Sequence, residues 1–253
     1  MQPTRPRFRP LAFVFVFCLA ARSDLPAVSS AEPRATPGRQ AKEIEGWTVQ
    51  ISDVLLEKNK AETEKALELL TAQLQEIKRV VPAKAVAELQ KVTLWFSPEY
   101  PGVQSRAEYH PDAGWLKDNK RDPVMAKGIE FTDVRNFERE TKRMPCFVLH
   151  ELAHSYHDRV LPRGFGHPEI KAAYDRAKAS GTYDKVEQRF GDGHSAQVKA
   201  YAMTNPMEYF AEDTEAFFGT NDFFPFTHDE LEKHDPVMCE LLGKLWGVPD
   251  DRK

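Results

Sequence analysis

CFVLHELAHSYHDRVL, residues 146–161, predicts a buried helix that carries ionisable side chains. Its apolar residues recur at helical spacing, and Pro162 and Gly164 follow where the helix should end. His150 and His154 are four residues apart, so their imidazoles should lie one turn apart, about 40° from each other around the helix axis. Unpaired polar groups are costly inside a buried helix. A metal ion shared by both imidazoles would satisfy them.

The glutamate between the two histidines completes the pattern H-E-x-x-H. Glu151 is rotated by about 100° from His150, so it should leave the metal free but reach a water bound to it. A water on Zn²⁺ has a pKa of about 7 and becomes a nucleophile when a carboxylate accepts its proton. Two core histidines with ordinary hydrogen bonds are the alternative interpretation. His157 lies two turns beyond His150, too far to share one ion, so we expect it to lie behind the ligands or to pack in the core.

A third metal ligand is expected from the segment YAMTNPMEYFAEDTEAFF, residues 201–218. Asn205 followed by proline predicts a helix start. Glu208, Glu212 and Glu215 are spaced four and three residues apart, so they share one face of a helix whose other faces are apolar. A capping role for Glu208 and a solvated acidic stripe for the other two remain alternatives.

The motif Y-x-x-T-N-x-x-E-[FY]-F-A-E at residues 201–212, about fifty residues after HELAH, resembles the catalytic domain of anthrax lethal factor and its relatives, which include the Pro-Pro endopeptidases. The resemblance implies a zinc peptidase of the gluzincin type. It also implies that Glu208 is the third zinc ligand, that Tyr201 hydrogen-bonds the developing oxyanion, and that Glu212 orients a metal-binding histidine. A phenol with a pKa near 10 can donate such a bond without being ionised.

The remaining sequence is consistent with one α+β domain over residues 46–253. Periodicity predicts an amphipathic helix that ends at Pro82, and a mostly helical C-terminal half. The predicted strands are 46–52, 91–97, 106–110 and 127–134, and the other predicted helices are 168–180, 206–218, one capped by Thr227 and Glu230, and one from Asp235–Pro236 to Trp246. The resemblance implies a zincin-like fold, with a small mixed sheet packed on the HExxH helix. In such folds an edge strand pairs with the substrate, and residues 106–110 are our candidate.

The N-terminus predicts export. Arg5, Arg7 and Arg9 precede the apolar run 11–21, which is too short to cross a hydrocarbon core of about 30 Å but fits the apolar region of a secretory signal. We therefore interpret residues 1–31 as a signal peptide, with a short membrane anchor as the alternative. Candidate cleavage sites follow Ala20, Ala21 and Ala31.

Residues 32–45 are poor in large apolar side chains and predict a flexible linker. The location would be secreted, periplasmic or otherwise outside the cytoplasm. In an oxidising compartment Cys146 and Cys239 could form one disulfide or remain two buried thiols, and the sequence leaves both open.

The predicted function is a secreted zinc-dependent peptidase, expected to be an endopeptidase, with His150, His154 and Glu208 as ligands, Glu151 as general base and Tyr201 as oxyanion donor. The alternatives are an exported, non-catalytic zinc-binding or interaction module, and metal-assisted hydrolysis of something other than a peptide. The formal net charge of −4 gives no basic excess, so nucleic acid is not an expected partner. Zn²⁺ is the expected cofactor, and a peptide or protein is the expected substrate.

Overall fold

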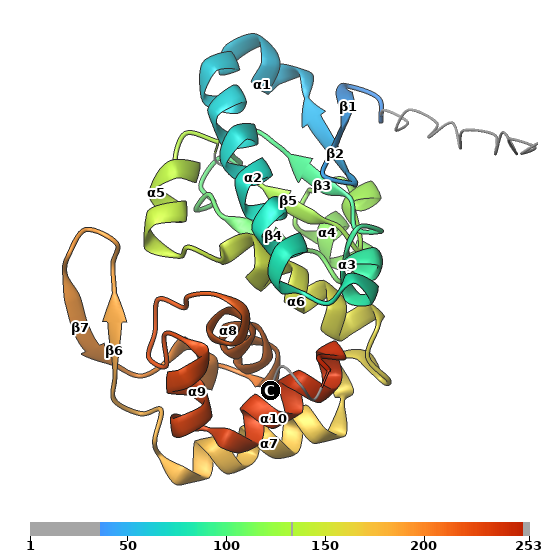
Figure 1. The fold of residues 1–253 in the computed structure, drawn as a ribbon. Coiled ribbons are helices and arrows are strands. Elements are labelled where there is room, and N and C mark those ends of the chain that lie inside the picture. The colour runs from blue at the N-terminus through green and yellow to red at the C-terminus, as the bar shows by residue number, and fades with distance from the viewer. Residues whose placement is uncertain (1–35, 133, 250–253) are drawn as a thin grey trace, which may run out of the picture. The chain divides into compact units, whose positions relative to one another are not determined.

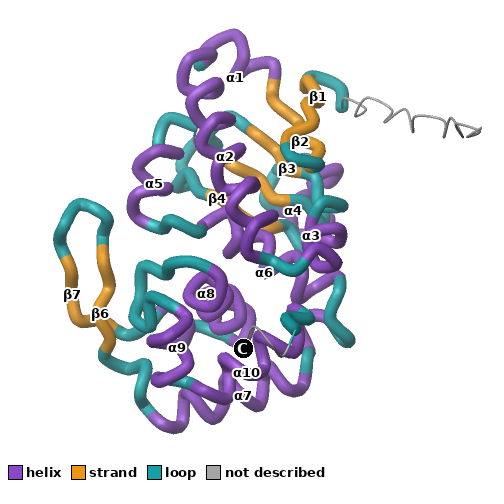
Figure 2. Tube along the Cα trace, in the orientation of Figure 1, coloured by secondary structure: helices purple, strands orange, loops and turns teal. Residues whose placement is uncertain are grey.

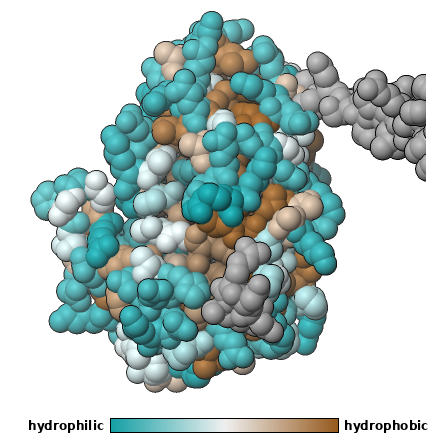
Figure 3. Space-filling model, viewed as in Figure 1, coloured by the Kyte–Doolittle hydropathy of each residue, from teal (hydrophilic) through white to brown (hydrophobic). Residues whose placement is uncertain are grey.

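The computed structural model describes residues 36–132 and 134–249 (Figure 1). The predicted signal peptide, residues 1–31, lies outside this part of the chain. Among the helices that these ranges contain, none is long and apolar enough to cross a bilayer. The face drawn in Figure 3 is hydrophilic over most of its area, with hydrophobic residues showing in smaller patches between the polar ones.

A mixed five-stranded sheet forms the N-terminal half, in the order β1 (Arg39–Ile44), β2 (Trp47–Ser52), β3 (Leu94–Phe96), β5 (Ile129–Phe131) and β4 (Ala107–Tyr109). Strands β2, β3 and β5 run parallel, whereas β1 and β4 pair antiparallel with their neighbours. The four strands predicted from the sequence are therefore confirmed, and β4, within the segment 106–110, lies at the edge of the sheet as proposed.

Strand β1 shows that the predicted linker, residues 32–45, is wrong for residues 39–44. Its sequence RQAKEI is polar, and Ile44 is its one buried residue. The strand is held instead by backbone pairing with β2 and by the side chain of Arg39, which donates to Phe96 O at 3.0 Å and to Ser97 Oγ at 2.9 Å. Periodicity could not reveal a strand that is stabilised by hydrogen bonds rather than by burial.

The helices account for the rest of the regular structure and confirm those predicted from periodicity and caps. The HExxH segment forms α6, and α7 and α8 begin and end at the predicted residues. The helices are α1 (Asp53–Lys58), α2 (Lys60–Val80), α3 (Ala83–Leu89), α4 (Ala113–Asp118), α5 (Phe137–Arg143), α6 (Phe147–Arg159), α7 (Pro168–Ser180), α8 (Pro206–Phe218), α9 (His228–His234) and α10 (Pro236–Trp246). Short 3₁₀ turns occupy Pro123–Met125, Gly164–Gly166 and Tyr201–Met203.

The sheet and the helical half share one core, and α6 is the element that joins them (Figure 1). On one side α6 contacts β4, α2 and α3, and on the other it packs on α8. Buried residues on α6 include Val148, Leu152 and Ala153, with no more than 2% of any of them exposed. The HExxH helix therefore has little freedom to move, which suits a site that must hold several side chains in fixed positions.

The structure also contains a hairpin that the sequence did not predict, formed by β6 (Val186–Arg189) and β7 (Ser195–Val198) (Figure 2). Its turn includes Gly191 and Gly193, whose positive φ angles of 76° and 90° suit glycine. Residues 191–194, GDGH, are polar and rich in glycine, a composition that indicates a loop without indicating the strands around it. Most side chains of both strands are at least partly exposed, so burial left no clear alternation to read.

Cys146 and Cys239 are both free thiols in this structure. Cys146 precedes α6 and accepts a hydrogen bond at Sγ from Thr220 N at 3.3 Å, whereas Cys239 is buried in α10. Burial raises the pKa of Cys146 to about 12 and that of Cys239 to about 11. Of the two states that the sequence left open, the structure shows the pair of thiols.

Candidate active site

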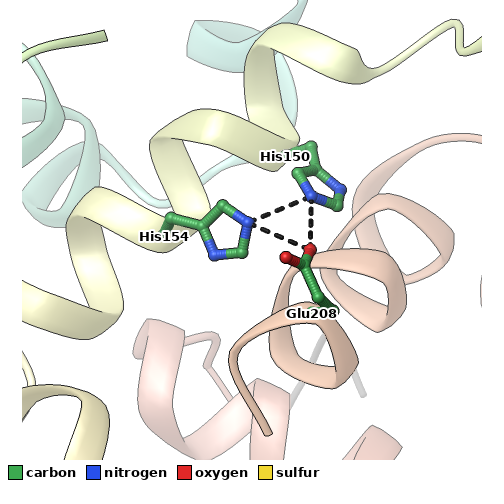
Figure 4. Close-up of side chains that lie close together, drawn as sticks. All are labelled: His150, His154 and Glu208. Atoms are coloured by element: carbon green, nitrogen blue, oxygen red, sulfur yellow. Dashed lines mark hydrogen bonds and ion pairs between the residues drawn. The ribbon is translucent and has the colours of Figure 1, made fainter. Parts of the chain in front are cut away.

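Helices α6 and α8 lie face to face and bring the predicted ligands together (Figure 4). The start of α8 is set by Asn205, whose Oδ1 accepts from Met207 N at 2.8 Å and from Glu208 N at 2.9 Å. This cap fixes Glu208 in the first turn of α8, with its carboxylate toward α6. Capping and metal binding were alternatives for this region of the sequence, but here Asn205 provides the cap and the Glu208 side chain remains available to the site.

Three atoms form a nearly equilateral triangle: His150 Nε2, His154 Nε2 and Glu208 Oε2. Its edges are 3.1 Å between the two nitrogens, 3.1 Å from His150 to Glu208 and 3.2 Å from His154 to Glu208. Three ligands at 2.0–2.1 Å from a tetrahedral Zn²⁺ lie about 3.4 Å from one another. The residues therefore fit a small divalent cation, because their donor atoms already converge at nearly the required spacing.

The charges of this triangle also fit a cation. Burial alone would raise the pKa of Glu208, but hydrogen bonds with His150 and His154 outweigh it and hold that pKa well below its usual value. Burial would likewise lower the pKa of His150, yet the carboxylates of Glu208 and Glu215 raise it. Positive charge at this point is thus favoured, and a metal ion can supply it in place of protons.

Behind the triangle, His150 is supported by a residue to which sequence reasoning gave no separate role. His150 Nδ1 lies 2.8 Å from Glu215 Oε1, whereas the nearest oxygen of Glu212 is 3.5 Å away. Both glutamates are buried, with 0% and 1% of their surface exposed. When Nε2 faces a metal, Nδ1 carries the hydrogen and donates it to Glu215, which fixes the ring. The available signal was the spacing of seven residues from Glu208, which returns to the same face of α8.

We expect Glu215→Met to weaken metal affinity by about 10–100-fold, because this is the usual cost of removing an outer partner of a ligating histidine. Glu212→Met, at the neighbouring buried carboxylate, is the matched control and should have a smaller effect. Competition with a chromogenic chelator measures both. A larger loss in Glu212→Met would assign the orienting role to Glu212, as the sequence resemblance implied.

Glu151 occupies a position beside the triangle and is held by the edge strand. Its Oε2 accepts a hydrogen bond from Tyr109 N, the last residue of β4, at 2.8 Å. On either side of this strand, Arg106 O accepts from Thr132 N and His110 N donates to Gly128 O. Because the backbone alternates, the N–H of Tyr109 points away from the sheet. The outer edge of β4 and the carboxylate of Glu151 therefore face the same space.

Tyr201 lies in the 3₁₀ turn before α8, and 46% of its surface is exposed. Burial of the rest of the ring and the nearby charge of Glu208 raise the pKa of its phenol, so the hydroxyl keeps its proton at neutral pH. A cavity of about 270 Å³ is lined by Tyr201, Glu151 and His150, and it extends to Arg143 and Asp222. The predicted base, ligand and phenol thus share one cavity.

His157 does not join the triangle. It is fully buried, its two ring nitrogens have no hydrogen-bond partner in the described part of the chain, and its ring packs against Phe165 and Phe210. We expected His157 either behind the metal ligands or packed in the core, and these contacts place it in the core. Burial lowers the pKa of His157 to about 3.

The buried imidazole of His157 predicts acid sensitivity. Its folded pKa lies below its unfolded value, so the unfolded state gains a proton between about pH 6.5 and 3 and stability falls over that window. Between pH 7 and 5 the parent should lose about 2 kcal/mol more than His157→Gln, which has no proton to gain. Denaturant unfolding of both proteins in chelator at the two pH values measures this difference. Equal losses in parent and variant would contradict the assignment.

The turn of the β6–β7 hairpin approaches the C-terminal end of α5 closely at Gly191. A Cβ on Gly191 would lie 2.3 Å from Lys142 O, next to the end of α5, whereas a Cβ on Gly193 would meet nothing within 4 Å. Both glycines have positive φ, so alanine costs about 1–2 kcal/mol at either position, but only Gly191→Ala must also displace the hairpin. We expect faster proteolysis and hydrogen exchange over residues 186–198 in Gly191→Ala than in Gly193→Ala. Identical behaviour would show that the contact does not hold the hairpin.

Comparison with known proteins gives a family match and a similar solved structure. Residues 120–241 match the sequence model of the glucose-regulated metallo-peptidase M90 family. A solved structure, the Pro-Pro endopeptidase PPEP-2 from Paenibacillus alvei, is 19% identical, covers 74% of this chain and 90% of its own, and superposes with a TM-score of 0.40. No curated protein is significantly similar in sequence.

The matched segment contains His150, Glu151, His154, Tyr201 and Glu208, so the family match and the converging side chains concern the same part of the molecule. The metallopeptidase class expected from the sequence is confirmed, and peptides or proteins are its class of substrate. The chain is a metallopeptidase, and its residues 120–241 carry the match to the M90 family.

Proposed function

We propose that the protein is a zinc-dependent endopeptidase in which His150, His154 and Glu208 hold the metal. The observation that carries this proposal is the triangle of donor atoms with edges of 3.1–3.2 Å beside a carboxylate that is not one of its corners. Two imidazoles and one carboxylate are a common ligand set of catalytic zinc, which keeps a further position for water or substrate. A zinc ion here would act as a Lewis acid that activates water and polarises a peptide carbonyl.

The chain's own residues would then move the protons. Glu151 is placed to accept a proton from the attacking water and to deliver it to the leaving amine nitrogen. Its hydrogen bond from Tyr109 N orients the carboxylate while one oxygen remains for this transfer. Tyr201 keeps its phenolic proton and can donate a hydrogen bond to the carbonyl oxygen as negative charge develops there.

The edge strand supports a substrate that binds in an extended form. The backbone of β4 alternates, so the N–H and C=O of Ala107 point away from β5 in the same way as the backbone of Tyr109. A peptide can add to such an edge as a further strand, and this would bring its backbone past Glu151. Pairing along a strand edge requires no chain terminus, which favours cleavage within a chain.

We also propose that the protein acts outside the cytoplasm. The support is in the sequence: three arginines followed by the apolar run 11–21 have the composition of a secretory signal. Fractionation of cells that produce the full chain, with mass spectrometry of the mature N-terminus, would test it. A protein retained in the cytoplasm with residues 1–31 intact would contradict export.

The activity is tested with the purified protein and a mixed peptide library analysed by mass spectrometry. Elemental analysis should find about one zinc per chain. Chelation should abolish cleavage, and zinc should restore it. Zinc without cleavage would favour a non-catalytic binding module, and cleavage that resists complete metal removal would contradict the mechanism.

A further inference from the structure

The cavity beside the catalytic residues has a polar end formed after α8. Asp222 follows the helix in a segment that pairs with the hairpin: Arg189 N donates to Asp222 O at 2.8 Å, and Gln188 forms a β-bridge with Phe223. These backbone contacts fix the carboxylate of Asp222 in the wall of the 270 Å³ cavity that also contains Glu151 and Tyr201.

This end of the cavity has more hydrogen-bond acceptors than donors. Asp222 is 2% exposed, and within the described residues its Oδ1 has no hydrogen-bond donor, while its Oδ2 accepts from Gln188 Nε2 at 3.2 Å. Both carboxylate oxygens of the buried Glu212 in the same wall also lack a donor. A buried acceptor without a partner is costly, so the site is suited to an incoming donor.

The arginine in the wall, Arg143, already has a carboxylate partner. Arg143 donates from Nε and Nη2 to Glu140 Oε2 at 2.9 and 2.7 Å, and its Nη1 is 3.6 Å from Asp222 Oδ2. Glu140 therefore offsets the charge of Arg143, and the carboxylate of Asp222 leaves the polar end negative. Met144 and Phe223 provide apolar walls that are less buried than Asp222.

We propose that this cavity is a specificity pocket for a basic side chain, lysine or arginine, next to the scissile bond, with Asp222 as its counter-ion. The methylene stem would pack on Met144 and Phe223, as the stems of long basic side chains commonly do at apolar surfaces. The charged end would extend to the carboxylate of Asp222. Burial raises the pKa of Asp222. An ammonium or guanidinium group that enters the pocket would stabilise its ionised form. The proposal rests on the proposed peptidase function.

The test compares cleavage of matched peptides that carry arginine, lysine, glutamine or glutamate at each position flanking the scissile bond. The parent should prefer a basic residue at one of these positions. Asp222→Asn should lower kcat/KM for that peptide about 30-fold, which corresponds to about 2 kcal/mol at 1.36 kcal/mol per factor of ten. Activity on the glutamine peptide should fall less than activity on the basic peptide, and a parent-like denaturant unfolding transition should show that the variant is folded.

A second variant places the cation in the protein itself. Gln188→Lys puts an ammonium group beside Asp222 Oδ2, where it should compete with the substrate and remove the basic preference while the glutamine peptide is still cleaved. Arg143→Gln is the matched control and should retain the preference. A parent that favours glutamate, with this preference lost in Arg143→Gln, would overturn the proposal, as would unchanged selectivity in Asp222→Asn.

Binding measurements with an inactive variant test the pocket independently of the proposed peptidase function. Zinc-loaded Glu151→Gln should bind the labelled basic peptide more tightly than the glutamine peptide, and the added Asp222→Asn substitution should abolish the difference. Cleavage without a basic preference overturns the pocket alone. Absence of any cleavage by the parent overturns the peptidase function, while the binding difference still decides the pocket.

Discussion

Glu151→Gln should lower kcat by about 10²–10⁴-fold, the usual contribution of a positioned general base. The amide oxygen of glutamine can still accept the hydrogen bond from Tyr109 N, so the contact with β4 is preserved. The carboxylate is not a corner of the ligand triangle, and metal content should therefore be unchanged. Turnover of a cleaved library peptide and elemental analysis of the same sample measure both quantities.

A small loss of activity in Glu151→Gln, with full metal content, would mean that another group accepts the proton. A large loss accompanied by loss of metal would mean that Glu151 contributes to binding rather than to chemistry. The conservative Glu151→Asp variant distinguishes the effect of side-chain length from the effect of losing the carboxylate charge. It keeps the carboxylate but shortens it, and it should retain more activity than the glutamine variant.

Glu208→Ala should lower metal affinity by more than about 100-fold, since even outer partners of a ligand contribute 10–100-fold. It removes one of three converging donors, and no other carboxylate oxygen in the described residues lies in the same triangle. Competition with a chromogenic chelator measures the affinity. Glu169→Ala, at an exposed carboxylate that pairs with Lys244, is the control and should bind metal as the parent does. Parent-like affinity in Glu208→Ala would remove Glu208 from the ligands.

Much of the site was predictable because short-range rules determine it. The spacing of His150 and His154 places both rings on one face of a helix, whatever surrounds it. Asn205 followed by proline fixed the start of α8 and hence the turn that carries Glu208. The family resemblance then implied that these two helices bring their side chains together. The residue spacing within either helix cannot show which helix packs against which.

The remaining features depend on contacts between residues far apart in the chain. Strand β1 is polar and is held by its pairing with β2, and the turn of the β6–β7 hairpin approaches Lys142 closely at Gly191. Glu215 shares a face with Glu212, and its seven-residue spacing from Glu208 does not by itself identify it as the partner of His150. The bond from Tyr109 N to Glu151 comes from the backbone, so no side-chain pattern could encode it.

The most direct test of the central claim is anomalous diffraction at the zinc absorption edge from crystals of the purified protein. We predict one strong peak within the triangle formed by His150 Nε2, His154 Nε2 and Glu208 Oε2. The structure contains a second, adjacent group of potential ligands, His150 Nδ1 with Glu212 and Glu215. A peak at that second group, or no peak near α6 and α8, would contradict the account.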